Sequence, residues 1–286
     1  MLTGLLWAAG AITLIAFVDR YLLKGWLRFN WRTFVFYGYV SFCSTFAIPF
    51  FALFNPGHCI NSKRISYVLR LASYLVGIEW EVRGLEVLGQ RRGCVAVANH
   101  QSSFDILGMF WFWRWSHLIA AVAKKEIFYA WPFGLAAWLA GVVFIDRINS
   151  DKARGQLAHA AKLMAEHDVK LWLFPEGTRN KRRRCLMPFK KGAFHVAVAC
   201  QAPIMPVVYS PYYFINPHNN FHTGGKVIVT VLPYIETAGL TMDDIDDLKN
   251  KIWQQMAQTY DKVAAEMRTK LPADYPGLVG FEEKES

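Results

Sequence analysis

The sequence predicts an α/β protein with a largely parallel central sheet flanked by helices, preceded by an N-terminal pair of membrane helices. From residue 62 onward, strand-length apolar runs alternate with segments of helical periodicity, which is typical of a parallel sheet covered on both faces. Before that point the 286-residue chain is almost entirely apolar or aromatic. We therefore expect a membrane-anchoring segment in 1–61, one α/β domain in 62–275 and a disordered tail in 276–286.

The N-terminal segment contains two uncharged runs, Leu2–Val18 and Phe34–Asn55. A bilayer span needs about 20 residues, so the second run is long enough and the first is short. Both are apolar all round, which favours membrane helices over core helices with one apolar face. Whether they span the bilayer or dip into one leaflet stays open. Spanning would place the basic connector in the cytoplasm and the large domain on the opposite side, whereas a one-leaflet hairpin suits an enzyme supplied from the cytosol.

The connector between these runs carries cations every four residues, interleaved with aromatic and leucine side chains. These cations are Arg20, Lys24, Arg28 and Arg32. On a continuous helix they would form one stripe, as in a helix lying in the headgroup plane. The alternative is a simple basic loop.

The folded part is expected to contain seven strands. They are Glu79–Arg83, Val95–Ala98, Leu118–Ala123, Val142–Asp146, Lys170–Phe174, Ile204–Tyr209 and Val227–Leu232. The expected helices are Ser62–Val76, Asp151–His167, Gly192–Cys200 and a long last helix from Ile245, opened by a capping box at Thr241 and Asp244. In such sheets ligands bind beyond the carboxyl ends of the strands.

Charge and composition limit the partners. The net charge of +10 indicates an acidic partner, which means nucleic acid, an anionic membrane or a phosphorylated substrate. Eleven tryptophans favour a bilayer with anionic lipids. We expect no nucleic acid, because the cations adjoin apolar runs and no recognition motif is present. Five scattered cysteines without a CxxC argue against a disulfide framework or a zinc site. The sequence indicates no oligomeric state.

The stretch Asn99-His100-Gln101-Ser102-Ser103-Phe104-Asp105 follows the strand-like run CVAVA. One interpretation is only local, with Ser102 as a helix N-cap and Asp105 as its capping partner. In the other, the helix begins at Ser102 and His100 folds back onto the Asp105 carboxylate, which leaves its other ring nitrogen free to accept a proton. Because the chain has no GxSxG nucleophile elbow, a substrate hydroxyl would then attack, as in acyl or phosphoryl transfer.

A second motif, FPEGTRN, ends the strand-like run KLWLF. Pro175 cannot continue a strand, and Gly177 lets the backbone approach a ligand. Arg179 offers a fork of donors matched to phosphate. Further basic side chains lie at expected strand ends. Lys124 follows the expected strand Leu118–Ala123, and Arg147 ends the run GVVFIDR.

Four of these stretches resemble, in the same order, the motifs of the glycerolipid acyltransferase family. They are NHQSSFD, FIDR, FPEGTRN and APIMPVV. The resemblance is greatest to the 1-acyl-sn-glycerol-3-phosphate (lysophosphatidic acid) acyltransferases. It covers roughly Ser62 to Leu232 and extends to the paired N-terminal apolar helices. Four ordered motifs at strand ends are far more specific than a lone HxxxxD.

The resemblance implies that His100 is the general base on the acceptor hydroxyl and that Asp105 orients it. The implied substrate-binding positions are Lys124, Arg147, Glu176, Gly177, Thr178 and Arg179. The implied reaction moves an acyl group from acyl-CoA to the sn-2 hydroxyl of lysophosphatidic acid, giving phosphatidic acid. Because CoA thiolate is a good leaving group, we expect neither a metal nor any other cofactor. The implied location is the endoplasmic reticulum membrane, with the active site facing the cytosol.

Three alternatives stay open. Within the class, the acceptor could be another lysophospholipid or glycerol 3-phosphate. A lysophospholipase would instead release free fatty acid. Outside the class, the chain could be a non-catalytic membrane protein that binds anionic lipids, against which the intact His100 and Asp105 argue.

Overall fold

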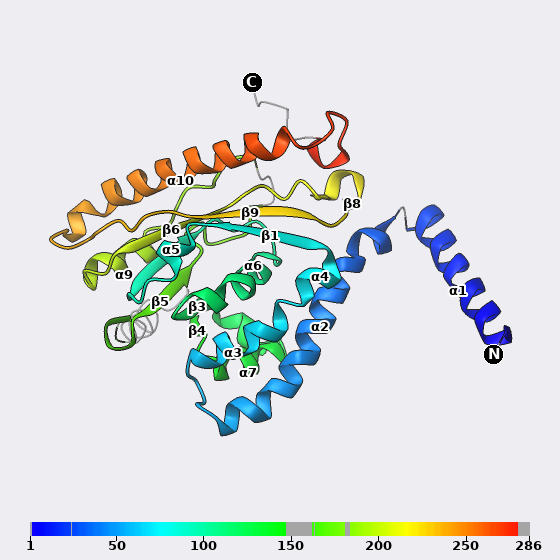
Figure 1. Ribbon diagram of the computed structural model, residues 1–286, viewed down its shortest axis with the longest axis horizontal. Coiled ribbons are helices and arrows are strands. Elements are labelled where there is room, and N and C mark those ends of the chain that lie inside the picture. The colour runs from blue at the N-terminus through cyan, green and yellow to red at the C-terminus, as the bar shows by residue number, and fades with distance from the viewer. Residues whose placement is uncertain (1, 24, 147–161, 163, 181–183, 280–286) are drawn as a thin grey trace.

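The computed structural model describes residues 2–23, 25–146, 162, 164–180 and 184–279. Its centre is a seven-stranded sheet of order β1-β9-β6-β2-β5-β3-β4 (Figure 1). The strands are β1 (Ile78–Arg83), β2 (Cys94–Ala98), β3 (Leu118–Lys124), β4 (Val143–Ile145), β5 (Val169–Leu173), β6 (Ile204–Tyr209) and β9 (Gly225–Val231). The predicted α/β class is confirmed, and each predicted strand is found to within two residues at either end.

The sheet is largely parallel, with a change of direction at one side. Strands β6, β2, β5, β3 and β4 run parallel to one another. Strand β9 pairs antiparallel with β6, and β1 pairs parallel with β9. Between β6 and β9 the chain contains no crossover helix; it forms the small hairpin of β7 (Ile215–Asn216) and β8 (Phe221–His222), with one 3-10 turn at Pro217–Asn219. A parallel pair needs a crossover connection, so β9 returns antiparallel.

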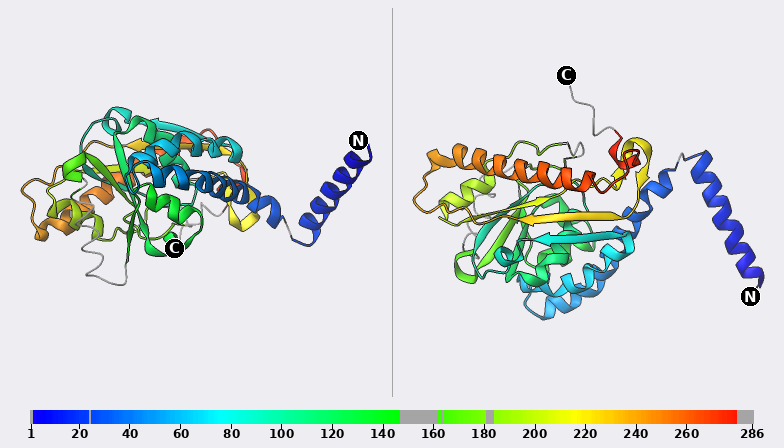
Figure 2. Two further views of the ribbon diagram at one scale, coloured as in Figure 1. Left: turned by 90° about the horizontal axis from the view of Figure 1, so that it is seen from below. Right: turned by 45° about the horizontal axis from the view of Figure 1, so that its top comes forward.

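Helices cover both faces of this sheet (Figures 1 and 2). One face carries α9 (Gly192–Ala199) and α10 (Ile245–Arg268), and the other carries α2 (Trp26–Leu53), α3 (Ile60–Leu69), α4 (Ala72–Val76) and α6 (Asp105–Phe112). Strand β2 has apolar side chains on both faces, so both need cover. Val95 and Val97 enter the α9–α10 core, whereas Ala96 and Ala98 enter the core beneath α2 and α6. A strand buried on both faces reads as a continuous apolar run.

The remaining elements are short, apart from α1. They are α1 (Leu2–Tyr21), α5 (Leu85–Leu88), η1 (Trp113–Trp115), η2 (Lys125–Tyr129), α7 (Phe133–Leu139), η3 (Pro217–Asn219), η4 (Met242–Asp244) and η5 (Pro276–Leu278). The predicted capping box is confirmed, since Thr241 N–H and its hydroxyl both donate to Asp244 Oδ2, at 2.7 and 2.8 Å. It precedes α10, whose apolar positions face the core.

Two helix predictions need correction or lie outside the described residues. The single helix Ser62–Val76 is wrong, because the chain bends between α3 and α4. There Leu71 N–H donates to Val68 O and Ser73 N–H to Arg70 O, so the turn tightens from four residues to three. Of the helix predicted for Asp151–His167, only residues 162 and 164–167 are described, and these are helical.

The N-terminal prediction is supported for one helix of the pair. Among the described residues only α2 is long and apolar enough to cross a membrane, judged by length and composition. Helix α1 projects away from the rest of the molecule (Figures 1 and 2). The predicted continuous basic stripe is wrong, because the helix breaks before α2. Gly25 has a φ of 80°, and the Asp19 carboxylate accepts from Leu27 N–H and Arg28 N–H, at 2.7 and 3.1 Å. Lys24 lies outside the described residues.

Helix α2 is packed on the α/β domain. Phe36 and Val40 are buried in the core beneath the sheet, and Phe51 packs with Leu139 and Ala140 at the end of α7. Arg32 donates to Val76 O and His222 O, at 2.9 and 3.3 Å. The division expected at residues 61 and 62 therefore falls inside α3 and within one packed unit.

At the other end, ordered chain continues beyond the expected boundary at 275. The Asn216 side-chain amide donates to Pro276 O and Val279 O, at 3.1 and 2.8 Å, and so holds η5. The predicted tail therefore starts too early. Residues 280–286 lie outside the described residues.

Candidate active site

The predicted motifs meet at one edge of the sheet. Strands β2, β5, β3 and β4 are neighbours in that order and parallel, so their carboxyl ends lie together. In the pairing of β2 with β5, Val97 is level with Leu173, so two residues further on Asn99 is level with Pro175. In the pairing of β3 with β5, Ala121 is level with Trp172, so three residues further on Lys124 is also level with Pro175. At about 4.8 Å between strands, the β3 end lies about 10 Å from the β2 end.

The centre of this edge is a histidine–aspartate pair. His100 Nδ1 lies 2.7 Å from Asp105 Oδ2. The Asp105 carboxylate is fully buried, whereas the His100 side chain is 21% exposed. An ionised carboxylate can only accept, so Nδ1 carries the hydrogen. Nε2 is then free to accept a proton from a substrate, which is the arrangement expected of a general base.

The capping interpretation and the catalytic interpretation use the same carboxylate. Asp105 Oδ2 also accepts from Gln101 N–H at 2.7 Å and from Ser102 N–H at 3.1 Å. Helix α6 begins at Asp105 rather than at Ser102, which corrects the expected start. The aspartate therefore closes the turn that carries His100 and holds its ring at the same time. Because these two amides donate to Asp105, they are not free to stabilise an oxyanion.

The FPEGTRN turn contacts His100 on the side opposite Asp105. The His100 ring stacks on the Phe174 ring, with centroids 4.1 Å apart and an interplanar angle of 18°. His100 N–H donates to Glu176 Oε1 at 2.9 Å, and His100 O accepts from Asn180 N–H at 2.7 Å. Ring and backbone are thus both set by the turn that follows β5.

Glu176 lies beneath the site. It is buried, and its second oxygen accepts from Met187 N–H at 3.4 Å. Burial raises the pKa of this carboxyl to about 7; the two N–H donors oppose that rise, and the nearby Asp105 charge adds to it. The contacts of Glu176, which was expected among the substrate-binding residues, are those of a group that positions the His100 backbone.

Arg179 reaches the motif from the exposed side. Its Nη1 donates to Ser103 Oγ at 2.6 Å, and the Tyr37 hydroxyl of α2 donates to the same oxygen at 2.7 Å. Thr178 and Arg179 are exposed, and Gly177 has a φ of 73°. A Cβ at Gly177 would lie 2.8 Å from the Lys190 side chain. A guanidinium and two hydroxyls therefore converge at the surface next to His100.

The other predicted cations are less closely tied to this centre. Lys124 is exposed at the end of β3, level with Ile145 of β4. Its neighbour Lys125 forms an ion pair with Asp146, at 3.3 Å. Arg147 and residues 181–183 lie outside the described residues.

Sequence reasoning missed several supporting residues. Asn99 ties β2 to β6, donating to Tyr209 O at 3.0 Å and accepting from Tyr209 N–H at 2.8 Å. Gln101 donates to Ser210 O at 2.9 Å. Their place beside His100 in the motif is a usable signal for both. Tyr37 carries no such signal, because only the packing of α2 brings it to Ser103.

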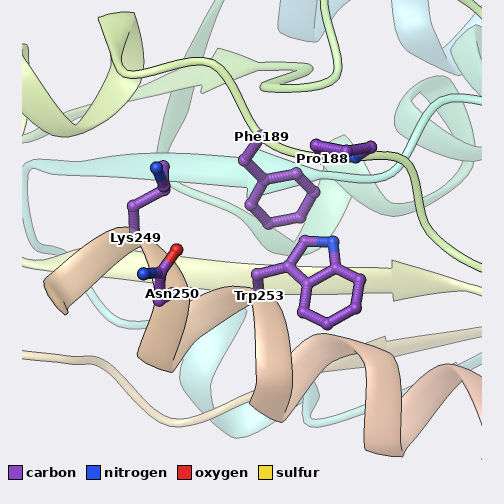
Figure 3. Close-up of a pocket in the computed structure, with 5 residues that line it drawn as sticks. All are labelled: Pro188, Phe189, Lys249, Asn250 and Trp253. Carbon is purple, nitrogen blue, oxygen red and sulfur yellow. The ribbon is translucent and has the colours of Figure 1, made fainter. Parts of the chain in front are cut away.

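Two hollows lie away from this pair. A small one of about 150 Å³ lies between the segment before α9 and α10 (Figure 3). It is lined by Pro188, Phe189, Lys249, Asn250 and Trp253. A larger apolar groove of about 510 Å³ separates α2 from α3. Neither is lined by His100 or Asp105.

A buried aspartate that orients a histidine at the carboxyl edge of an α/β sheet is the arrangement expected of a general-base site. In agreement, residues 79–210 match the Acyltransferase family model. The chain is similar to 1-acyl-sn-glycerol-3-phosphate acyltransferase alpha of Mus musculus, with 37% identity over 231 residues covering 80% of each chain. It is 39% identical over 201 residues to the beta enzyme of Homo sapiens, covering 70% of this chain and 71% of that one. This chain belongs to the 1-acyl-sn-glycerol-3-phosphate acyltransferase family.

The fold has a counterpart among solved structures. The crystal structure of the 1-acyl-sn-glycerophosphate (LPA) acyltransferase PlsC from Thermotoga maritima superposes with a TM-score of 0.62. It covers 84% of this chain and 97% of its own, at 22% sequence identity. At that identity the likeness shows a shared fold.

Proposed function

We propose that this protein transfers an acyl group from acyl-CoA to the sn-2 hydroxyl of 1-acyl-sn-glycerol 3-phosphate, giving phosphatidic acid and CoA. The observation that carries the proposal is the 2.7 Å contact between His100 Nδ1 and Asp105 Oδ2, in a chain of this family. The pair supplies a base but no nucleophile of its own, so the attacking oxygen comes from the substrate.

The proposed reaction is a direct transfer. His100 Nε2 takes the proton of the sn-2 hydroxyl as its oxygen attacks the thioester carbonyl. The new C–O bond forms, the C–S bond breaks, and the departing CoA thiolate takes the proton from the imidazolium. Asp105 stabilises the imidazolium and keeps Nδ1 in its donor role. The step needs no metal in this proposal, because the thiolate is already a good leaving group.

The exposed cations would hold the phosphate of the acceptor. Arg179 donates to Ser103 Oγ, within the motif that carries His100 and Asp105. Its fork of N–H donors suits a phosphate. Gly177 and Thr178 shape the turn that presents it, and Lys124 and Arg147 are the further phosphate ligands we propose. Glu176 acts from below, through the backbone of His100.

We place the protein on the endoplasmic reticulum membrane, with its active site facing the cytosol that supplies acyl-CoA. The packing of α2 favours one leaflet over a span. From Arg32 to Phe51 the helix contacts the α/β domain. If α2 crossed the hydrocarbon core, the attached domain would have to enter it too. Burying the polar surface of that domain in hydrocarbon would cost free energy.

The test is acyl transfer by purified protein with radiolabelled oleoyl-CoA. Lysophosphatidic acid, lysophosphatidylcholine and glycerol 3-phosphate are compared as acceptors, and free fatty acid is quantified. We expect phosphatidic acid from wild type and none from His100→Ala. Preference for another acceptor would overturn the substrate assignment, and free fatty acid released from the lysophospholipid, rather than from oleoyl-CoA, would favour a lysophospholipase. A His100→Ala variant that stays active would overturn the catalytic role.

A further inference from the structure

A chain of hydrogen bonds leads from helix α10 to the backbone of His100. The indole Nε1–H of Trp253, on α10, donates to Met187 O at 3.0 Å. Met187 N–H donates to Glu176 Oε2 at 3.4 Å, and the other oxygen of that carboxylate accepts from His100 N–H at 2.9 Å. Trp253 is therefore connected to His100 through two intermediate groups, although it packs in the α9–α10 layer of the molecule.

The middle of this chain is the segment 184–191, which precedes α9. Its side chain Leu186 is buried in the α9–α10 core. Met187 is only half-buried, and its backbone N–H and O have partners on two sides, Glu176 and Trp253. The segment therefore bridges α10 and the turn that follows β5.

A second connection between this segment and His100 runs in parallel with the first. Asn180 N–H donates to His100 O at 2.7 Å, and the buried Asn180 side chain donates through Nδ2 to Cys185 O at 2.6 Å. The N–H and the O of His100 thus both depend on partners that are attached to the segment 184–191. A displacement of that segment would be passed on to the residue that carries the base.

Helix α10 gives the segment a firm support. Ile252, the neighbour of Trp253, is fully buried, so packing sets the position of the helix. The indole ring of Trp253 borders the small hollow together with Pro188 and Phe189 (Figure 3). Because the ring is not close-packed on that side, its hydrogen bond to Met187 O contributes to holding the segment in place.

The link between Met187 and Glu176 is the most sensitive to displacement. At 3.4 Å it is the longest of the three, beyond the usual upper bound of about 3.2 Å. If it broke, the buried Glu176 carboxylate would lose one of its two N–H donors, which leaves a desolvated acceptor without a partner. Glu176 would then shift or take up a proton, and either change alters the acceptor that His100 N–H faces.

We propose that Trp253 is a positioning residue for the reaction, which fixes the segment 184–191 and, through Met187 and Glu176, the place of His100. A catalytic group must be held within about 0.5 Å of its productive position, so a small movement of the segment lowers kcat. The effect falls on kcat rather than on KM, because the chain of hydrogen bonds ends at the residue that takes the proton. This inference rests on the proposed function, in which His100 is the base.

The test compares two variants that each remove one aromatic donor to a backbone oxygen. Trp253→Phe keeps an aromatic ring and removes the Nε1–H. The matched control is Tyr234→Phe, because the Tyr234 hydroxyl donates to Val87 O at 3.2 Å. Tyr234 follows β9, which runs antiparallel to β6, so it lies at the sheet edge opposite His100. Steady-state kinetics with oleoyl-CoA and lysophosphatidic acid give kcat and KM for both.

Trp253→Phe should lower kcat by about two- to tenfold, which corresponds to one hydrogen bond, and leave both KM values unchanged. Tyr234→Phe should leave kcat unchanged. In a Glu176→Gln background, Trp253→Phe should cause little further loss, because both substitutions interrupt the same chain. The proposal is overturned by fully additive losses, by an unchanged kcat in Trp253→Phe, or by equal losses in the two single variants.

Hydrogen–deuterium exchange without substrates separates this inference from the proposed function. Circular dichroism and Tm first establish that both variants are folded. In Trp253→Phe, exchange should quicken in the peptides that contain Met187 and His100, whereas Tyr234→Phe should match wild type in both. If wild type transfers no acyl group, the proposed function fails, and exchange still decides whether Trp253 holds His100. Unchanged exchange in the His100 peptide would overturn the positioning role at any level of activity.

Discussion

The two helical layers each cover one face of the sheet, but their outer surfaces differ in composition. Helix α10 buries its apolar positions on the inner side, and charges at both of its ends form ion pairs. Lys191 and Lys249 both contact Asp246, at 2.7 and 3.0 Å, and Lys270 contacts Glu266 at 2.8 Å. The layer of α2, α3 and α4 instead exposes aromatic rings and carries cations without carboxylates.

The difference shows that two helical layers can cover the same sheet with outer faces of opposite composition. An outer face of paired charges suits water on the α10 side. The α2 side has apolar groups on both its inner and outer faces. Four paired substitutions test how far this division extends to function.

The largest effect is expected from two aspartates that begin helices in opposite layers. Asp105→Asn should lower kcat by roughly 10²- to 10⁴-fold, because it removes the carboxylate that holds His100 and sets its tautomer. Asp244→Asn, in the capping box before α10, should lower Tm slightly and leave kcat unchanged. Steady-state kinetics and thermal melts check both. Comparable losses of activity in the two variants would show that Asp105 acts only as a cap.

The second comparison uses two glutamates with opposite pKa shifts. The folded-state pKa of Glu176 is about 7, above its ordinary 4.5, so the folded protein binds the proton more tightly and stability falls as pH rises from about 4.5 to about 7. Arg83 and Lys270 lower the pKa of Glu266 to about 2, so its stabilisation is present above about 4.5 and is lost as pH falls toward 2.

Glu176→Gln should therefore reduce the dependence of the unfolding free energy on pH between about 4.5 and about 7. Glu266→Gln should reduce that dependence below about pH 4.5. Only the first should lower kcat, roughly ten- to a hundredfold, because His100 N–H or Met187 N–H loses its acceptor and the base shifts. Denaturant melts across pH, together with kcat, measure both. An unchanged kcat in Glu176→Gln would contradict its positioning role.

The third comparison lies within α2 and concerns two tyrosines. Tyr37 donates to Ser103 beside Arg179, whereas Tyr39 donates to Val68 O of α3. Tyr37→Phe should raise the KM for lysophosphatidic acid by about two- to tenfold, the value of one hydrogen bond. Tyr39→Phe should lower Tm and leave KM unaltered. A KM that rises equally in both variants would point to a general loosening of α2.

The smallest effect is expected from the ion pairs on the α10 side. Lys191 and Asp246 are 52% and 55% exposed, and such pairs contribute little to stability. Lys191→Ala should leave Tm and activity near wild type. Ile252→Ala, at a fully buried position of α10, should cost about 2–5 kcal/mol of unfolding free energy. A clear loss of Tm in Lys191→Ala would mean that surface charge, rather than packing, holds α10.

The sequence by itself determined the features that depend on neighbouring residues. Strand β2 is readable because CVAVA is apolar on both faces, and the capping box because Thr241 and Asp244 lie three positions apart. The link between His100 and Asp105 is readable for the same reason, since their spacing lets one turn bring them together.

Only the tertiary structure decided the features that depend on residues far apart in the chain. The direction of β9, the packing of α2 on the domain and the arrival of Tyr37 at Ser103 all rest on such contacts. The inward aim of Glu176 is of the same kind, because its partner His100 comes from a different strand end. Local spacing fixes which side chains one turn can bring together, whereas packing of distant segments sets what each of those side chains faces.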